Sequence, residues 1–182
     1  MTTLATPKYE LLAHDTIEFA VEGRTLHRIR AVRDFGDVKA GDLGGYVERE
    51  ANLSHEGSCW VADDARAFGH ARVFGDAQIF GDALVFGDAK VYGKAMIFGE
   101  ALAFDRAQVH GETEVFGNAE VCDKARVFGE AVVTGDAYVG GTAWVCGKAK
   151  IDGNTVLRSG THNGATAQDA NGSEDAAAAP GM

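Results

Sequence analysis

The chain has no long apolar run, few cysteines and little positive charge, and each absence excludes a class of protein. No apolar run approaches the 18 or so residues of a membrane-spanning helix, so we expect no membrane segment. The formal net charge at pH 7 is −10, which argues against a protein that coats nucleic acid. Nucleic acid is therefore not expected as a partner.

The three cysteines, Cys59, Cys122 and Cys146, are an odd and widely spaced set without the spacing of a metal site. The N-terminus, MTTLATPKYELLAHD, lacks the basic start and apolar core of a secretory signal. These features predict a cytoplasmic protein with free thiols and no bound metal. No Ser-His-Asp spacing, P-loop or dinucleotide fingerprint is present either.

What the chain does contain is a six-residue unit that repeats without a break through the 16 hexads of residues 65–160. Position 1 is Ala, position 3 is Val, Ile or Leu, and position 5 is Gly. The exceptions are Thr113, Thr155, Ala67, Ala103, Asp105, Asp123 and Ser159. Because side chains alternate along a strand, positions 1 and 3 should point inward and positions 2 and 4 outward. Gly at position 5 supplies a corner with positive φ, which Asp also tolerates.

A period of six predicts an all-β fold, a single-stranded parallel β-helix in which three hexads form one triangular coil. The hexads GYVERE (45–50), ANLSHE (51–56) and CWVADD (59–64) precede the unbroken run, and Gly57-Ser58 interrupts them. The total of 19 hexads predicts about six coils. We therefore predict a β-helix over residues 45–160.

The flanking segments lack the hexad. Residues 1–44 are interpreted as an N-terminal β-hairpin cap, because the end of a solenoid exposes backbone and apolar groups; a separate functional domain is the alternative. In the cap, residues 1–8 are expected to be loose, and Asp15–Val21 and Arg24–Val32 are expected to be strands joined at Glu22-Gly23. Residues 161–182 are small and polar, and we expect a disordered tail.

The hexad resembles the hexapeptide repeat of the LpxA-like superfamily, whose fold is a left-handed parallel β-helix. Only this resemblance implies the left hand, since the general rule for parallel crossovers predicts a right-handed turn. A right-handed triangular solenoid of the bactofilin kind is the alternative. The block RIRAVRDFGDVKAGDLGGYVEREANLSHEGSCWV (28–61), followed by AxVFGDA repeats, resembles the YdcK-like subgroup and its short phage and prophage relatives. That subgroup is classed as acyltransferases from its fold, without an assigned substrate.

Residues three hexads apart should stack, which sorts the outward side chains onto three walls. Wall one carries an apolar set that predicts an interface, either between copies of the chain or with a protein partner. The resemblance implies a trimer. The alternative is an aromatic ladder that covers its own backbone. The predicted interface residues are Phe68, Leu84, Phe86, Leu102 and Phe104.

Wall two alternates cations with aromatic side chains, which could hold a phosphorylated or sugar ligand or a single strand of nucleic acid. Cation–π stacking between coils is the alternative. The candidate ligand-binding residues are Arg72, Lys90, Tyr92, Arg126 and Phe128. Wall three is mixed. At position 6, charges of opposite sign are expected to stack, as in Lys94 with Glu112, Asp88 with Arg106, and Glu130 with Lys148.

The sequence favours a non-catalytic structural or binding β-solenoid, of a kind that the resemblance links to phages and prophages. The alternative is an acetyl-coenzyme A-dependent acyltransferase, because members of the superfamily use a His base near a subunit interface. His110 is the candidate base, although no carboxylate is placed to orient it. His55, His70 and His110 occupy different repeat positions, which argues against a three-histidine zinc site. Outside the alternative, no cofactor is expected.

Overall fold

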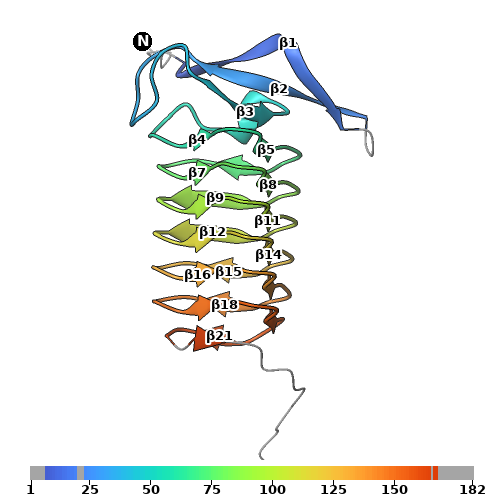
Figure 1. The fold of residues 1–182 in the computed structure, drawn as a ribbon, viewed down its shortest axis with the longest axis vertical. Coiled ribbons are helices and arrows are strands. Elements are labelled where there is room, and N and C mark those ends of the chain that lie inside the picture. The colour runs from blue at the N-terminus through green and yellow to red at the C-terminus, as the bar shows by residue number, and fades with distance from the viewer. Residues whose placement is uncertain (1–6, 20–22, 165, 168–182) are drawn as a thin grey trace, which may run out of the picture.

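The structure is a computed structural model that describes residues 7–19, 23–164 and 166–167. It confirms an all-β parallel solenoid of about six coils, in which strands stack along one axis (Figure 1). The one short helical segment in these ranges is the 3-10 turn η1 (Glu50–Asn52). No helix in the described ranges is long and apolar enough to cross a membrane.

The strands form three sheets, one for each wall. The sheet of wall one contains β1 (Tyr9–Phe19), β2 (Arg24–Ala31), β3 (Leu43–Val47), β5 (Arg66–Ala67), β8 (Leu84–Val85), β11 (Leu102–Ala103), β14 (Glu120–Val121), β17 (Tyr138–Val139) and β20 (Val156–Leu157). The sheet of wall two contains β6 (Arg72–Val73), β9 (Lys90–Gly93), β12 (Gln108–Gly111), β15 (Arg126–Val127), β18 (Trp144–Val145) and β21 (Thr161–His162). The sheet of wall three contains β4 (Trp60–Val61), β7 (Gln78–Ile79), β10 (Met96–Ile97), β13 (Glu114–Val115), β16 (Val132–Val133), β19 (Lys150–Ile151) and β22 (Thr166–Ala167).

The predicted register of three hexads per coil is confirmed. Arg66 pairs with Leu84, and Leu84 pairs with Leu102, each three hexads further along the chain. Tyr46 instead pairs with Arg66, which lies three hexads and two more positions along, because Gly57-Ser58 adds two residues to the first coil. The insertion therefore lengthens one coil and leaves the later walls aligned.

The inward positions form a core composed mainly of small aliphatic side chains. Ala83 and Val85 are fully buried, as are the corresponding residues of the other coils through Ile151. Outward residues donate backbone hydrogen bonds to the next coil, as when Arg66 N donates to Ala83 O at 2.9 Å. Burial of each Val stabilises the fold by about 1.5–3 kcal/mol, which backbone ordering largely offsets.

The corners require a left-handed backbone. Asp105 and Asp123, the two aspartates at position 5 within the unbroken repeat, have φ of 54° and 57°. At Ser159 the left-handed residue is instead Gly160, with φ of 83°. The corner thus moves by one position, and Trp144 pairs with Thr161, one position short of three hexads.

Strands β1 and β2 form an antiparallel hairpin that continues the sheet of wall one through β3. The hairpin lies across the N-terminal end of the solenoid and extends past it on the side of β5 and β8 (Figure 1). Strand β1 begins at Tyr9, earlier than the predicted Asp15. The expectation that Lys8 is loose is wrong, because its side chain is fully buried and hydrogen-bonded to Cys59. The capping role of residues 1–44 and the handedness stay predictions.

At the other end, β21 and β22 lie beyond Gly160 and pair with β18 and β19. Two strands therefore continue past the predicted end of the repeat. The predicted disordered tail otherwise falls on residues 165 and 168–182, which lie outside the described residues.

Candidate functional site

Wall one carries a column of parallel rings. The Phe68 and Phe86 rings stack with centroids 5.1 Å apart, and Phe86 stacks on Phe104 at 5.0 Å, with interplanar angles of 2° and 3°. The upper end of this column is covered, because Leu26 and Tyr46 pack on Phe68 and leave it only 7% exposed. Phe68 therefore does not belong to the exposed part of the predicted interface.

The other predicted interface residues remain half-buried. Leu84 and Leu102 are direct partners on β8 and β11, and their side chains point outward with Phe86 and Phe104. The ring faces are buried against one another, while ring edges and the two leucines meet solvent. The structure thus contains the aromatic ladder and an apolar outer surface together.

Beyond Phe104, wall one carries a polar cluster that sequence reasoning missed. The Cys122 thiol donates to the Tyr138 hydroxyl at 3.1 Å, and that hydroxyl donates to Asp123 Oδ2 at 3.4 Å. The Tyr138 ring occupies the space over Gly140, where a Cβ would lie 2.5 Å from it. The sequence signal that could have predicted this cluster is Gly140, which replaces the usual aromatic residue at position 4.

This cluster is unsuited to nucleophilic chemistry. Burial raises the pKa of the Cys122 thiol, and Cys122 is only 2% exposed. The hydrogen bond that links Tyr138 to Cys122 is the main cause that raises the pKa of Tyr138 to about 12. Because nucleophilic attack needs the thiolate, the contacts indicate packing.

Wall two also carries a ring stack. Tyr92 lies 4.8 Å from Phe74 and 4.6 Å from His110, and His110 lies 5.3 Å from Phe128, measured between centroids. Interplanar angles of 4–10° show that each inner ring has both faces covered. Bases of a single-stranded nucleic acid would need free ring faces, so Tyr92 and His110 cannot provide stacking platforms.

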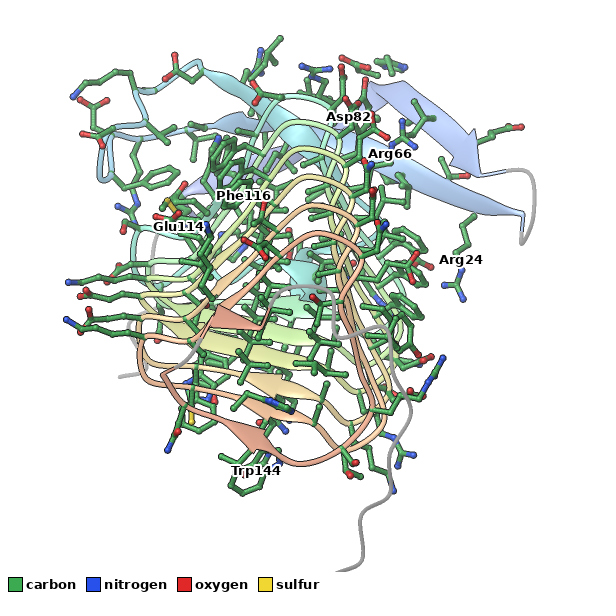
Figure 2. The ribbon with its side chains drawn as sticks, turned by 60° about the horizontal axis from the view of Figure 1, so that its bottom comes forward. Arg24, Arg66, Asp82, Glu114, Phe116 and Trp144 are labelled. Atoms are coloured by element: carbon green, nitrogen blue, oxygen red, sulfur yellow. The ribbon has the colours of Figure 1, made fainter. Side chains whose placement is uncertain are left out.

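The lower end of wall two differs, since Trp144 is 43% exposed and projects away from the coils (Figure 2). The Arg126 guanidinium lies 5.2 Å from the Trp144 ring centroid. Phe128 meets the same ring edge-on at 6.3 Å. Two of the candidate ligand-binding residues, Arg126 and Phe128, are therefore engaged with Trp144, and the Arg126 contact is the cation–π stacking that was the alternative interpretation.

His110, the candidate catalytic base, sits within this stack. Burial lowers its pKa, and nearby Arg126 lowers it further, so both effects favour the neutral ring. In the described ranges its ring nitrogens make no hydrogen bond that would orient them. A base without an orienting partner is poorly prepared for proton transfer.

The other histidines lie apart from His110. His55 stacks on Tyr9 with centroids 4.3 Å apart, and its Nδ1 accepts a hydrogen bond from Lys8 N at 3.3 Å. His70 is exposed beside Arg49, with 3.4 Å between Nδ1 and Nη2. No group of three or more His, Cys, Asp or Glu residues in the part of the chain described here could hold a metal ion.

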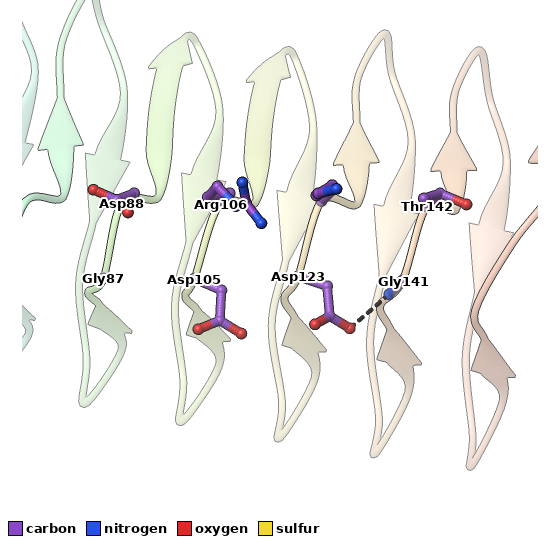
Figure 3. Close-up of a pocket in the computed structure, with 8 residues that line it drawn as sticks. Gly87, Asp88, Asp105, Arg106, Asp123, Gly141 and Thr142 are labelled. Atoms are coloured by element: carbon purple, nitrogen blue, oxygen red, sulfur yellow. Dashed lines mark hydrogen bonds between the residues drawn. The ribbon is translucent and has the colours of Figure 1, made fainter.

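The corner between walls one and two is hollowed into grooves. One groove, of about 540 Å³, follows positions 5 and 6 of successive coils (Figure 3). Within it Asp123 Oδ2 accepts a hydrogen bond from Gly141 N at 2.7 Å. A second groove, of about 360 Å³, faces wall two and is lined by His70, Arg72, Asp88, Lys90, Arg106 and Gln108. Position in the hexad placed Arg72 and Lys90 together on wall two, but it did not place Arg106 with them.

Two pairs of stacked charges at position 6 form ion pairs, and both lie in the column that follows wall two. Lys94 Nζ lies 2.8 Å from Glu112, and Lys148 Nζ lies 3.3 Å from Glu130, which confirms both predicted pairs. Asp88 and Arg106 line the same grooves, but in the described part of the chain no ion pair within 4.0 Å joins their charged groups. The predicted stacking of Asp88 with Arg106 is thus present in the register, but it brings no ion pair between these two described residues.

A buried polar contact joins the N-terminal segment to the first coil. Lys8 Nζ donates to Cys59 O at 2.7 Å and lies 3.2 Å from Cys59 Sγ. Burial lowers the pKa of Lys8 and raises that of Cys59. Both side chains are fully buried, so this contact holds the segment in place and presents no accessible nucleophile.

Comparison with known proteins gives short matches within the repeat. A family model described as the YdcK β-solenoid repeat matches residues 77–93. A curated Escherichia coli (strain K12) protein, named as an uncharacterized acetyltransferase YdcK, is 51% identical over 47 residues. That match covers 25% of this chain and 14% of the relative. The chain is thus similar, over these segments, to the YdcK β-solenoid repeat.

Proposed function

We propose that this chain is a non-catalytic binding protein, a rigid β-prism that associates with a second copy of itself through wall one. The observation that carries the proposal is the column Phe68–Phe86–Phe104. Leu26 of the hairpin and Tyr46 of β3 cover its upper end, whereas Phe86 and Phe104 further along stay half-buried. A surface that already packs Leu26 and Tyr46 at one end is suited to pack an apolar partner at the other.

The regularity of the coils supports a binding role. From β5 to β19 the paired strands keep the spacing of three hexads. Between these described strands no inserted loop projects from the coils to enclose a substrate. The wall with Leu84, Phe86, Leu102 and Phe104 is instead a surface that regular strand pairing and ring stacking preorganise. Rigid surfaces lose little conformational freedom on association, which favours binding.

Self-association is tested by size-exclusion chromatography with light scattering on the full chain and on the double variant Leu84→Asp/Phe104→Asp. We expect an oligomer for the original chain and a monomer for the variant, because two carboxylates cannot be buried in an apolar interface without partners. Met96→Asp is the matched control, since Met96 is a half-buried outward residue of wall three. Circular dichroism verifies that each variant is folded.

A monomer at all concentrations of the original chain would contradict self-association. An oligomer that survives the double substitution, or that Met96→Asp disrupts equally, would show that wall one is not the interface.

A second candidate function, acyl transfer from acetyl-coenzyme A, is favoured by the 47-residue similarity to a protein named as an acetyltransferase. Neutral His110 could accept a proton there. However, the two grooves beside walls one and two are lined by other residues and do not include His110. Neither of these two grooves therefore places His110 beside a bound thioester.

The two functions are separated by calorimetric titration with acetyl-coenzyme A. A binding prism should give no saturable heat at millimolar concentration. Saturable binding that is weakened by His110→Ala but kept by Phe74→Leu, at the end of the same stack, would favour the transferase instead.

A further inference from the structure

The smaller groove at the corner between walls one and two has the size of a small-ligand site and a concentration of positive charge. Its volume is about 360 Å³, near the lower end of the range for ligand pockets. Arg72 and Lys90 enter from wall two, and Arg106 enters from the corner that follows wall one. The chain has a net charge of −10, but the three cations make the local charge of this groove positive.

The cations of this groove lack the carboxylate partners found elsewhere on the solenoid. Lys94, Lys148 and Lys150 each lie within 3.3 Å of a carboxylate oxygen. For Arg72 and Lys90, in contrast, the described residues place no carboxylate oxygen within 4.0 Å of the charged group. The Arg106 guanidinium likewise has no carboxylate oxygen of the described residues within 4.0 Å, although Asp88 lines the same groove.

The two cations of wall two are also side by side on neighbouring strands. Arg72 and Lys90 are direct partners on β6 and β9, adjacent strands whose backbones lie about 4.8 Å apart. Two like charges on neighbouring strands repel each other, although solvent screens the repulsion between exposed groups. An anion bound between them would remove this repulsion, so the arrangement is one that ligand binding would stabilise.

The ligand's chemistry follows from the groups that are available. Guanidinium groups match phosphate oxygens in a two-pronged geometry, and a lysine ammonium adds a point charge. The neighbouring Tyr92 and His110 rings have both faces covered, so neither offers a platform for a nucleobase beside the cations. The groove is therefore suited to the anionic group itself.

We propose that this groove is a binding site for a small polyphosphate group, held by Arg72, Lys90 and Arg106. Asp88 is the carboxylate among the lining residues and opposes the ligand's charge. The proposal is independent of self-association through wall one, because none of its residues belongs to the apolar column. It sharpens the ligand-binding prediction for wall two by adding Arg106 and by leaving out the aromatic faces.

The test is isothermal titration of the full chain with inorganic tripolyphosphate at low salt, with the same titration on Arg72→Gln, Arg106→Gln and Asp88→Asn. Loss of one exposed cation should weaken binding about three- to fivefold, as expected for single exposed charge pairs. Asp88→Asn should strengthen binding about twofold or more, since it removes a repulsive charge. Raising the salt concentration should weaken binding to the original chain.

Lys94→Gln is the matched control, because Lys94 is an exposed lysine of the next corner and is paired with Glu112. It should change the affinity little. Absence of saturable binding at millimolar tripolyphosphate, or equal weakening by Lys94→Gln, would overturn the proposal. So would tighter binding of a single-stranded oligonucleotide that depends on Trp144, since that would indicate a nucleic-acid surface.

The same titration on Leu84→Asp/Phe104→Asp separates the two proposals. Unchanged tripolyphosphate affinity in that variant, whatever its oligomeric state, would show that the groove acts within one copy of the chain.

Discussion

The N-terminal segment and the coils are stabilised in different ways. In the coils, buried Ala and Val and the same backbone hydrogen bonds recur from one coil to the next. In the N-terminal segment the contacts are individual: the Tyr9 hydroxyl is within 3.0 Å of two backbone carbonyls, Glu50 O and Leu53 O, and Lys8 Nζ donates to Cys59 O. Repetition distributes stability over many equivalent residues, whereas the irregular segment depends on a few.

The largest effect is expected at Tyr9. Tyr9→Ala should lower the free energy of unfolding by about 3–5 kcal/mol, because it leaves a large cavity in the core and removes the hydroxyl that bonds two carbonyls. Urea denaturation measures the loss. Val109→Ala, in a middle coil, is the comparison and should cost only about 1.5–3 kcal/mol. Equal losses at the two sites would break the distinction between the regions.

The second effect concerns a corner of the coils. Gly117 has φ of 74°, and a Cβ there would lie 2.9 Å from Gly135 O. Gly117→Ala should cost about 1–3 kcal/mol through left-handed strain and the backbone contact. Asp105→Gly is the opposite substitution at an equivalent position with φ of 54°, and it should be neutral or stabilising. Thermal melts of both variants measure the two effects. A Gly117→Ala protein with the melting temperature of the original chain would contradict the predicted strain at the corner.

A smaller, favourable effect is expected at Thr113, which replaces the usual buried Ala at position 1. Its side chain is fully buried, and its hydroxyl has no hydrogen-bond partner in the part of the chain that the structure describes. Thr113→Val keeps the shape and removes the orphaned hydroxyl, so the free energy of unfolding should rise by about 1 kcal/mol. A decrease in urea denaturation would show that the hydroxyl has a partner, such as a buried water.

The smallest effect is a dependence on pH in the N-terminal segment. Burial raises the pKa of Tyr9 above its ordinary value, and nearby Glu50 adds to the shift. A raised folded-state pKa means that stability is complete below the unfolded value of about 10 and is lost as the pH rises above it. The melting temperature should therefore fall more between pH 9 and 11 for the original chain than for Tyr9→Phe. Parallel pH curves for the two proteins would contradict the assignment.

Much of the fold could be predicted because the hexad encodes it locally. Alternation placed Ala83 and Val85 inside, and the register of three hexads placed Leu84 beside Leu102. The role of Gly57-Ser58 as a two-residue insertion followed from the same pattern. In contrast, the early start of β1 and the burial of Lys8 depend on residues outside the repeat and were missed.

The candidate surfaces could be predicted only in part. Position in the hexad identified the outward residues Phe86 and Phe104, but it could not show that the hairpin covers Phe68. It placed Arg72 and Lys90 on one wall. It did not show that Arg106, which lies at the adjacent corner, lines the same groove. It also could not show that Tyr138 folds over Gly140 and buries Cys122.

The sequence by itself determined the strands, the corners and the stacking register, because side-chain alternation and the freedom of glycine at positive φ act within a few residues. Tertiary structure alone decided which outward side chains stay exposed and which charges remain without partners. The physical reason is sequence distance: Lys8 and Cys59 meet 51 residues apart, and Leu26 packs on Phe68 from a different part of the chain. Such contacts depend on where the hairpin lies, and no period in the sequence specifies that position.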